Sequence, residues 1–159
     1  MSDREDHAAY DSSARFDENR IRAAAVYCSD GRFGEHFDEF LHNSLKLPRY
    51  DRLAVPGGAA CLAGHFLAFK EEEGLIEQLR FLVKAHGIER VVLVAHQDCA
   101  FYSERLHVPP SQVETRQRED VQAAAARIRS LARGLQVDAF FARKLPDGTI
   151  RFESLEQTQ

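Results

Sequence analysis

The stretch that decides the fold is Val91-Val92-Leu93-Val94-Ala95-His96-Gln97-Asp98-Cys99. It begins with apolar, mostly β-branched residues that run directly into a histidine and then a cysteine. A short continuous apolar run is typical of a strand buried on both faces, as in a parallel sheet with helices on each side. Ligands bind just beyond the carboxyl ends of such strands. His96 and Cys99 therefore lie where a site is expected, and both residue types bind metal ions.

A second stretch repeats this arrangement earlier in the chain. The apolar run Ala23-Ala24-Ala25-Val26-Tyr27 leads into Cys28-Ser29-Asp30-Gly31-Arg32. Two buried strands that each deliver a metal-binding side chain at the carboxyl end predict a zinc centre made by Cys28, His96 and Cys99. Zinc binds four ligands in tetrahedral geometry, and three protein ligands leave the fourth position for water. Zinc lowers the pKa of that water to about 7, so that hydroxide is available at neutral pH.

Asp30 and Arg32 lie next to the first expected ligand. In an extended loop alternate side chains point to the same side, so both are expected on the side of Cys28. A nearby arginine favours the ionised form of a carboxyl group. Three roles remain open for the carboxylate: it accepts a hydrogen bond from zinc-bound hydroxide, it binds zinc as the fourth ligand, or it forms with the arginine a structural ion pair that fixes the loop.

Composition limits the class of protein. The chain has 159 residues, 44% of them hydrophobic and 29% charged, which predicts one soluble domain with a substantial core. A net charge of −4 gives no indication of a nucleic-acid or anionic-membrane surface. No apolar segment reaches the roughly 20 residues that span a bilayer. The polar N-terminus is unlike a secretory signal, so we expect a cytoplasmic protein.

The chain contains three cysteines, Cys28, Cys61 and Cys99, which cannot all pair with one another. In a reducing compartment, cysteines close to a histidine are better interpreted as metal ligands or catalytic groups than as a disulfide. Cys61 does not end an expected strand, and we interpret it as a small buried apolar residue.

Hydrophobic periodicity and breaker residues predict a three-layer α/β/α fold with a mostly parallel central sheet and an antiparallel C-terminal edge strand. Residues 1–20, polar with scattered Tyr10 and Phe16, are expected to form an N-terminal arm, either frayed or as a short helix that docks on a partner such as a second subunit, and residues 21–159 a single domain. Expected strands are 22–27, 51–55, 88–95, 137–142 and 149–155; expected helices are 33–47, 59–70, a stripe at 75–83, and 113–133, with a loop at 101–112.

The combination Cys28-x-Asp30-x-Arg32 with a later His96-x-x-Cys99 at the end of an apolar strand resembles the β-class carbonic anhydrases. The match covers residues 21–102 and continues more weakly through the expected hairpin 137–155. Neither half of the motif is specific alone, but five matched positions in two strand-end contexts are specific together.

The resemblance implies a zinc lyase. Cys28, His96 and Cys99 would hold Zn²⁺, and Asp30 and Arg32 would form the catalytic dyad. The implied reaction is the reversible hydration of carbon dioxide to bicarbonate by a zinc-bound hydroxide. The implied assembly is a homodimer or a larger oligomer built from dimers, with active sites near the subunit interface.

The sequence also departs from the pattern of the family. Gly31 stands where serine is usual, and Ala100 replaces a glycine. The segment Ala54-Val55-Pro56-Gly57, followed by Gly58, replaces the family's Arg-Asn-Ala-Gly. Two alternatives therefore remain: a zinc enzyme that attacks another small electrophile, such as carbonyl sulfide or carbon disulfide, and a zinc-binding protein without catalytic activity.

Overall fold

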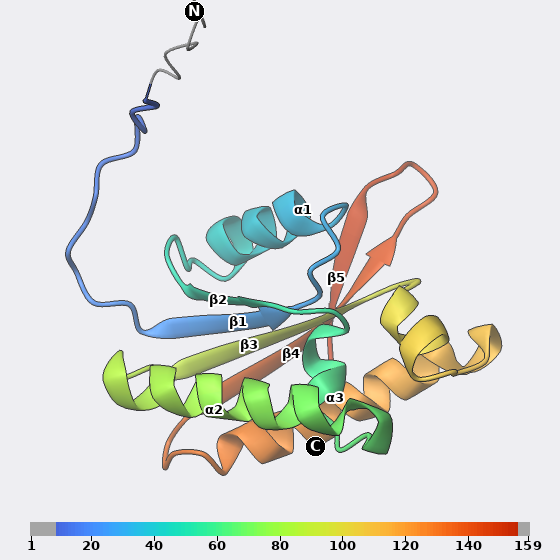
Figure 1. Cartoon of the computed structure of the whole chain (residues 1–159). Coiled ribbons are helices and arrows are strands. Elements are labelled where there is room, and N and C mark those ends of the chain that lie inside the picture. The colour runs from blue at the N-terminus through green and yellow to red at the C-terminus, as the bar shows by residue number, and fades with distance from the viewer. Residues whose placement is uncertain (1–8, 156–159) are drawn as a thin grey trace, which may run out of the picture.

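The apolar run 91–95 lies in the central strand of a five-stranded sheet (Figure 1). The computed structural model describes residues 9–155. Within them the strand order is β2-β1-β3-β4-β5, and all neighbours are parallel except β4 and β5. The strands are β1 (Ala23–Tyr27), β2 (Asp51–Ala54), β3 (Arg90–His96), β4 (Gln136–Lys144) and β5 (Ile150–Ser154).

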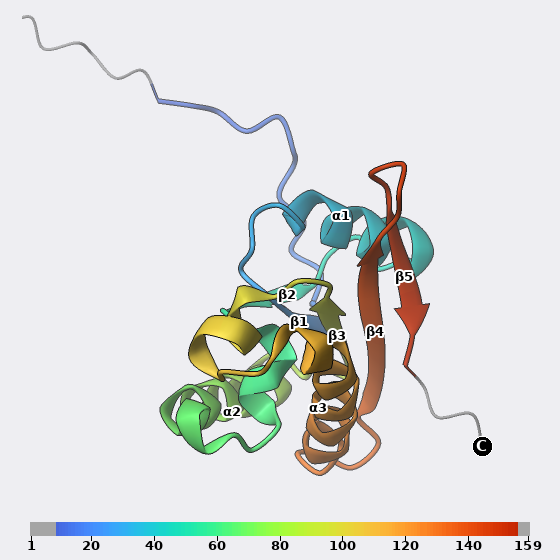
Figure 2. The same cartoon turned by 90° about the vertical axis from the view of Figure 1, so that its right-hand side faces the viewer.

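Helices cover both faces of this sheet. Helix α1 (Gly34–Glu39), continued by a π-helical turn at Phe40–Ser44, lies on one face. Helices α2 (Phe69–Ala85) and α3 (Val113–Arg129) lie on the other, as the side view shows (Figure 2). The predicted three-layer α/β/α fold, with a mostly parallel sheet and an antiparallel C-terminal edge strand, is confirmed.

The two inner strands are buried on both faces. Alternate side chains of a strand point to opposite faces, and in β1 Ala24 and Val26 pack in the core beneath α2 and α3, whereas Ala23, Ala25 and Tyr27 pack beneath α1. β3 follows the same alternation between its two faces. This double burial explains why both strands read as continuous apolar runs rather than as an alternating pattern.

Three sequence predictions on secondary structure were wrong. The expected helix 59–70 is two 3-10 turns, Gly58–Leu62 and Phe66–Ala68, because Gly64 between them has a positive φ of 85°. Helix α2 consequently begins at Phe69, earlier than its apolar stripe indicated. The expected loop 101–112 contains a π-helical turn at 101–105 and a 3-10 turn at 110–112.

Residues 9–20 form neither helix nor strand and extend from the body of the molecule (Figure 1). Tyr10 and Phe16 are almost fully exposed in this segment. Arg49 holds its end, donating to the carbonyls of Asp17 and Asn19. Residues 1–8 of the predicted arm lie outside the described residues. Between residues 9 and 155, no helix has both the length and the apolar composition needed to cross a membrane.

Gly58 lets the turn after β2 lie against the end of β1. Its φ is +51°, and a Cβ there would stand 2.9 Å from both the Tyr27 carbonyl carbon and the Cys28 nitrogen. We expect Gly58→Ala to lower the free energy of unfolding by roughly 1–3 kcal/mol, because both the backbone conformation and the close contact are lost. Urea denaturation measures the change.

Gly74 provides the matched control. It lies inside α2, and nothing stands within 4 Å of an added Cβ. Gly74→Ala should raise stability by roughly 0.5–1 kcal/mol, the helix-propensity difference between the two residues. Equal stabilities of the Gly58→Ala and Gly74→Ala proteins would contradict this account of the turn.

Candidate metal centre

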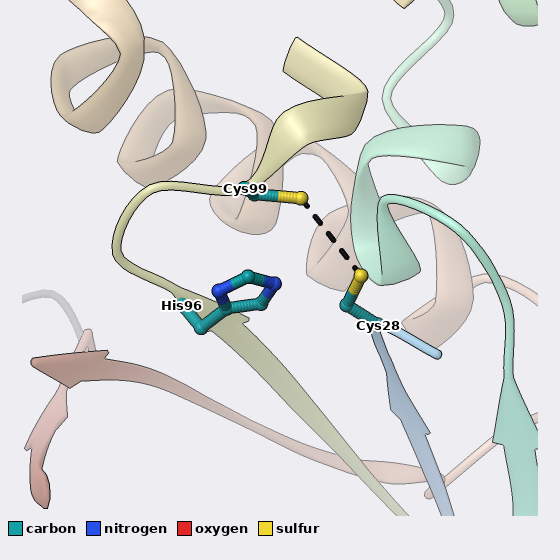
Figure 3. A group of neighbouring side chains, drawn as sticks. All are labelled: Cys28, His96 and Cys99. Atoms are coloured by element: carbon teal, nitrogen blue, oxygen red, sulfur yellow. Dashed lines mark hydrogen bonds between the residues drawn. The ribbon is translucent and has the colours of Figure 1, made fainter. Parts of the chain in front are cut away.

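Three potential metal ligands converge at the carboxyl ends of the two inner strands (Figure 3). Cys28 directly follows β1, His96 is the last residue of β3, and Cys99 follows three residues later. Parallel pairing aligns Tyr27 with Val94, so the two strands end side by side. One ligand atom from each of the three side chains lies within 4.8 Å of the others. The structure thus brings together the three residues that the sequence singled out.

The imidazole of His96 is oriented to act as a ligand. Its Nδ1 lies 2.8 Å from the carbonyl oxygen of Gln97, which can only accept, so Nδ1 carries the proton. Nε2 therefore has a free lone pair, and it is buried without a hydrogen-bond partner among the described residues. Phe33 covers the ring, with 4.3 Å between the ring centroids. Because a buried polar atom without a partner is costly, this nitrogen fits a metal ion.

The two cysteines form a coupled pair. The thiol of Cys99 donates to the sulfur of Cys28 across 3.9 Å. This hydrogen bond lowers the pKa of Cys28 to about 4 and raises the pKa of Cys99, so the pair shares one proton. Cys28 therefore favours the thiolate form, which is the form that binds metal ions.

Main-chain N–H groups also donate to both sulfurs. Gly57 and Asp30 donate to Cys28, and Phe101 and Tyr102 donate to Cys99. Each of these bonds favours the thiolate over the thiol. Gly57 has to be glycine in this arrangement, because a Cβ would lie 2.4 Å from the ring of Phe101. The turns on either side of the site thus stabilise the negative charge of two thiolates.

Asp30 and Arg32 form a bidentate ion pair beside the three ligands. The guanidinium donates from Nε to Oδ1 at 3.0 Å and from its terminal NH2 group to Oδ2 at 2.6 Å. The hydrogen bonds from Arg32 hold the pKa of Asp30 at about 2. The Asp30 carboxylate is not part of the metal-ligand group of three. It is directed instead to the guanidinium of Arg32, which binds both of its oxygens. This pairing is common to two of the three roles considered for Asp30, the hydrogen-bond acceptor and the structural ion pair, and it does not choose between them.

Cys61 lies apart from this group. It is buried, its thiol donates to the carbonyl of Pro56, and burial raises its pKa to about 11. It therefore stays protonated, in agreement with its interpretation as a small apolar core residue.

Sequence reasoning missed three residues that shape the site. Phe33 packs on the imidazole, Gly57 donates to Cys28, and Gln117 of α3 donates from Nε2 to the carbonyl of His96 at 2.8 Å. Main-chain donors and ring contacts depend on the path of the chain and have no signature in the sequence. Gln117 does have a signature in the sequence. It stands four residues before Val121 on the apolar stripe of α3, where a polar residue is unexpected.

Comparisons with known proteins agree with this geometry. Residues 18–150 match the model of the family described as "Putative carbonic anhydrase". No curated protein sequence matches the chain. A solved β-carbonic anhydrase, isoform I from the protozoan Trichomonas vaginalis, has a TM-score of 0.60 at 12% identity, covering 93% of this chain and 90% of its own. A carbonic anhydrase from Glaciozyma antarctica has a TM-score of 0.55 at 16% identity, with 85% and 82% covered.

At these identities the two structures establish the fold, and the family model establishes the relationship. It covers most of the chain, including all three residues of the metal-ligand group. The resemblance inferred from the two half-motifs is thereby confirmed. This chain belongs to the carbonic anhydrase family, as a divergent member with the fold of the β class.

Proposed function

We propose that this protein binds Zn²⁺ through Cys28, His96 and Cys99 and catalyses the reversible hydration of carbon dioxide to bicarbonate. One observation carries the proposal: the buried Nε2 of His96 has no hydrogen-bond partner among the described residues and shares a group with two sulfurs. Family membership supports a lyase of this kind. Zinc at two thiolates and an imidazole would lower the pKa of a coordinated water to about 7 and so supply a nucleophile at neutral pH.

The ligands are prepared for this role by their surroundings. The carbonyl of Gln97 fixes the tautomer of His96, so that the imidazole can bind without losing a proton. The hydrogen bond from the Cys99 thiol lowers the pKa of Cys28 and so favours its thiolate, which means that fewer protons have to leave when a metal binds than from two ordinary thiols. Binding should therefore depend on pH less than at a site made from two ordinary thiols.

Asp30 is the residue that accepts a hydrogen bond from the reacting water. Its pKa of about 2 keeps it a carboxylate, and hence an acceptor only, throughout the neutral range. Oδ1 accepts hydrogen bonds from both the main-chain N–H and Nε of Arg32, each at 3.0 Å. Oδ2 accepts from the terminal NH2 group at 2.6 Å and shares the Nε donor at the longer distance of 3.2 Å, so it is the oxygen better able to accept a further bond. Oδ2 would accept a hydrogen bond from water at the site and so orient that water toward the substrate. Arg32 keeps the carboxylate from turning to the metal.

An alternative is a zinc protein that acts on another small electrophile, such as carbonyl sulfide or carbon disulfide, or that has no catalytic activity. The altered segment Ala54–Gly58 favours it, because this turn forms one side of the site through the Gly57 N–H. The mutations below separate these alternatives.

The first test concerns the metal. Purified protein should contain about one zinc per chain, and Cys99→Ser and His96→Ala should lose most of it, because each change removes one of three protein ligands. Cys61→Ser is the matched control, since that thiol lies outside the group, and it should retain the metal. Full zinc occupancy in either ligand variant, measured by elemental analysis after dialysis, would refute the assignment.

The second test concerns Asp30 and Arg32. Asp30→Asn should retain zinc but lose roughly 10²-fold or more of the hydration rate, the loss typical for a positioned acceptor of a proton. Arg32→Ala should act similarly, because the released carboxylate would compete for the metal. Stopped-flow hydration assays at equal zinc content measure both, with the exposed Asp11→Asn as control. Unchanged turnover in Asp30→Asn would rule out this role. Absence of wild-type turnover would favour the non-catalytic alternative.

We also propose a cytoplasmic homodimer. All three cysteines are free, as suits a reducing compartment. Phe66, Leu67 and Phe69 form an exposed apolar group at the start of α2, as expected for a surface that a second copy covers.

Sedimentation at micromolar concentration should therefore show the mass of two chains. Phe66→Ser should shift the equilibrium toward the monomer, because it removes the most exposed ring of this group. Phe81→Ser, at an exposed ring near the end of α2 and away from this group, should not. A monomer in the wild type would contradict the homodimer.

A further inference from the structure

Helix α3 places two polar side chains beneath the metal-ligand group. Gln117 and Asp120 are both buried, with exposed fractions of 1% and 5%. They are three residues apart and therefore share one face of the helix. The rest of that face is apolar: Val121, Ala124, Ala125 and Ile128. Burying an amide and a carboxylate costs free energy that leucine would not, so their contacts must explain their presence.

Gln117 holds the chain at His96. Its Nε2 donates to the His96 carbonyl at 2.8 Å, and its Oε1 is buried without a partner among the described residues. Among the described residues, the side-chain amide of Gln117 therefore makes only the hydrogen bond to the His96 carbonyl. The same peptide unit is held on its other side by the Gln97 N–H, which donates to Ala142 of β4 at 2.9 Å. The carbonyl of Gln97, which orients the imidazole, belongs to the next peptide unit. Holding the His96–Gln97 unit in place therefore helps to position that carbonyl, and with it the direction of Nε2.

Asp120 holds the chain at Cys99. Its Oδ2 accepts a hydrogen bond from the hydroxyl of Tyr102 at 2.9 Å and lies 2.6 Å from Nε2 of His65. Tyr102 is buried against Cys99, and its own N–H donates to the Cys99 carbonyl at 3.1 Å. His65 belongs to the segment that follows the turn at Gly57 and Gly58. One carboxylate thus connects α3 to both stretches whose N–H groups surround the sulfurs.

We infer that Gln117 and Asp120 are positioning residues of the metal centre, one orienting the imidazole ligand and the other, through Tyr102, the thiolate of Cys99. The inference rests on the proposed zinc site. It adds to that site a support on α3, an element that lies outside both half-motifs in the sequence. Removing such a support typically lowers metal affinity roughly 10- to 100-fold while the ligands themselves remain.

The test uses two variants that remove the hydrogen bonds and keep the shape. Gln117→Leu deletes the donor to the His96 carbonyl, and Tyr102→Phe deletes the donor to Asp120. Their matched controls are Gln122→Leu, on the exposed side of the same helix, and Tyr10→Phe, in the exposed arm. Zinc affinity is measured by competition with a chromophoric chelator. Cobalt(II) substitution reports ligand geometry through the ligand-field bands and thiolate bonding through the sulfur-to-metal charge-transfer band.

We expect both variants to bind zinc roughly 10- to 100-fold more weakly than the wild type. Gln117→Leu should change the ligand-field bands, Tyr102→Phe should change the charge-transfer band, and both controls should match the wild type. Thermal unfolding of the metal-free proteins separates positioning from a merely structural role. A structural role would lower the melting temperature and leave the affinity and the cobalt spectrum of the folded protein unchanged, and that result would overturn the inference.

The outcomes distinguish this inference from the function on which it rests. If the wild type binds neither zinc nor cobalt, the proposed function fails and the inference fails with it. If the wild type binds and both variants bind with wild-type affinity and spectrum, the inference alone fails. If Gln117→Leu does not fold, Tyr102→Phe decides, because loss of a single hydroxyl leaves the packing of the ring intact.

Discussion

The parallel pairing of β1 with β3 is the constraint on which the rest of the structure depends. Its register aligns Tyr27 with Val94, so that the chain leaves both strands at one edge of the sheet. There Cys28 and His96 come together although they are 68 positions apart in the sequence. Side chains alternate along a strand, so a shift of one residue would turn His96 away from Phe33 and reverse the buried faces. Because apolar side chains line both faces of these strands, the packing of particular side chains, such as Phe33 on His96, is what opposes that shift.

The loop that carries the remaining ligand is held by the next strand. Between His96 and Cys99, Asp98 adopts a left-handed conformation with φ of 57°, which aspartate tolerates better than most residues. Its carboxylate pairs with the Lys144 ammonium at 2.6 Å, and the Lys144 N–H donates to the side chain of Gln97 at 3.0 Å. β4 thus fixes the two residues that let the chain turn back and present Cys99.

The fold and the metal-ligand group could be predicted from the sequence because both depend on short-range patterns. Apolar runs identify buried strands, and residues directly after the strands identify what gathers at the sheet edge. The 3-10 turns at 58–68 could not be predicted, because alanine-rich composition favours a helix, and the left-handed conformation of Gly64 and the extended conformation of His65 interrupt it. Gln117 and Asp120 lie on another element, and their relation to the site exists only after α3 has packed on the sheet.

The hydrogen bonds to the two sulfurs come from main-chain N–H groups, and this has a consequence for how the protein can change. Every residue except proline carries such a donor, so most substitutions at Phe101, whose side chain has no assigned role in binding or catalysis, leave the bond itself in place. Relatives can therefore diverge at this position and still keep the same electronic environment for the Cys99 thiolate. What they must share is the path of the backbone, which sequence identity does not measure.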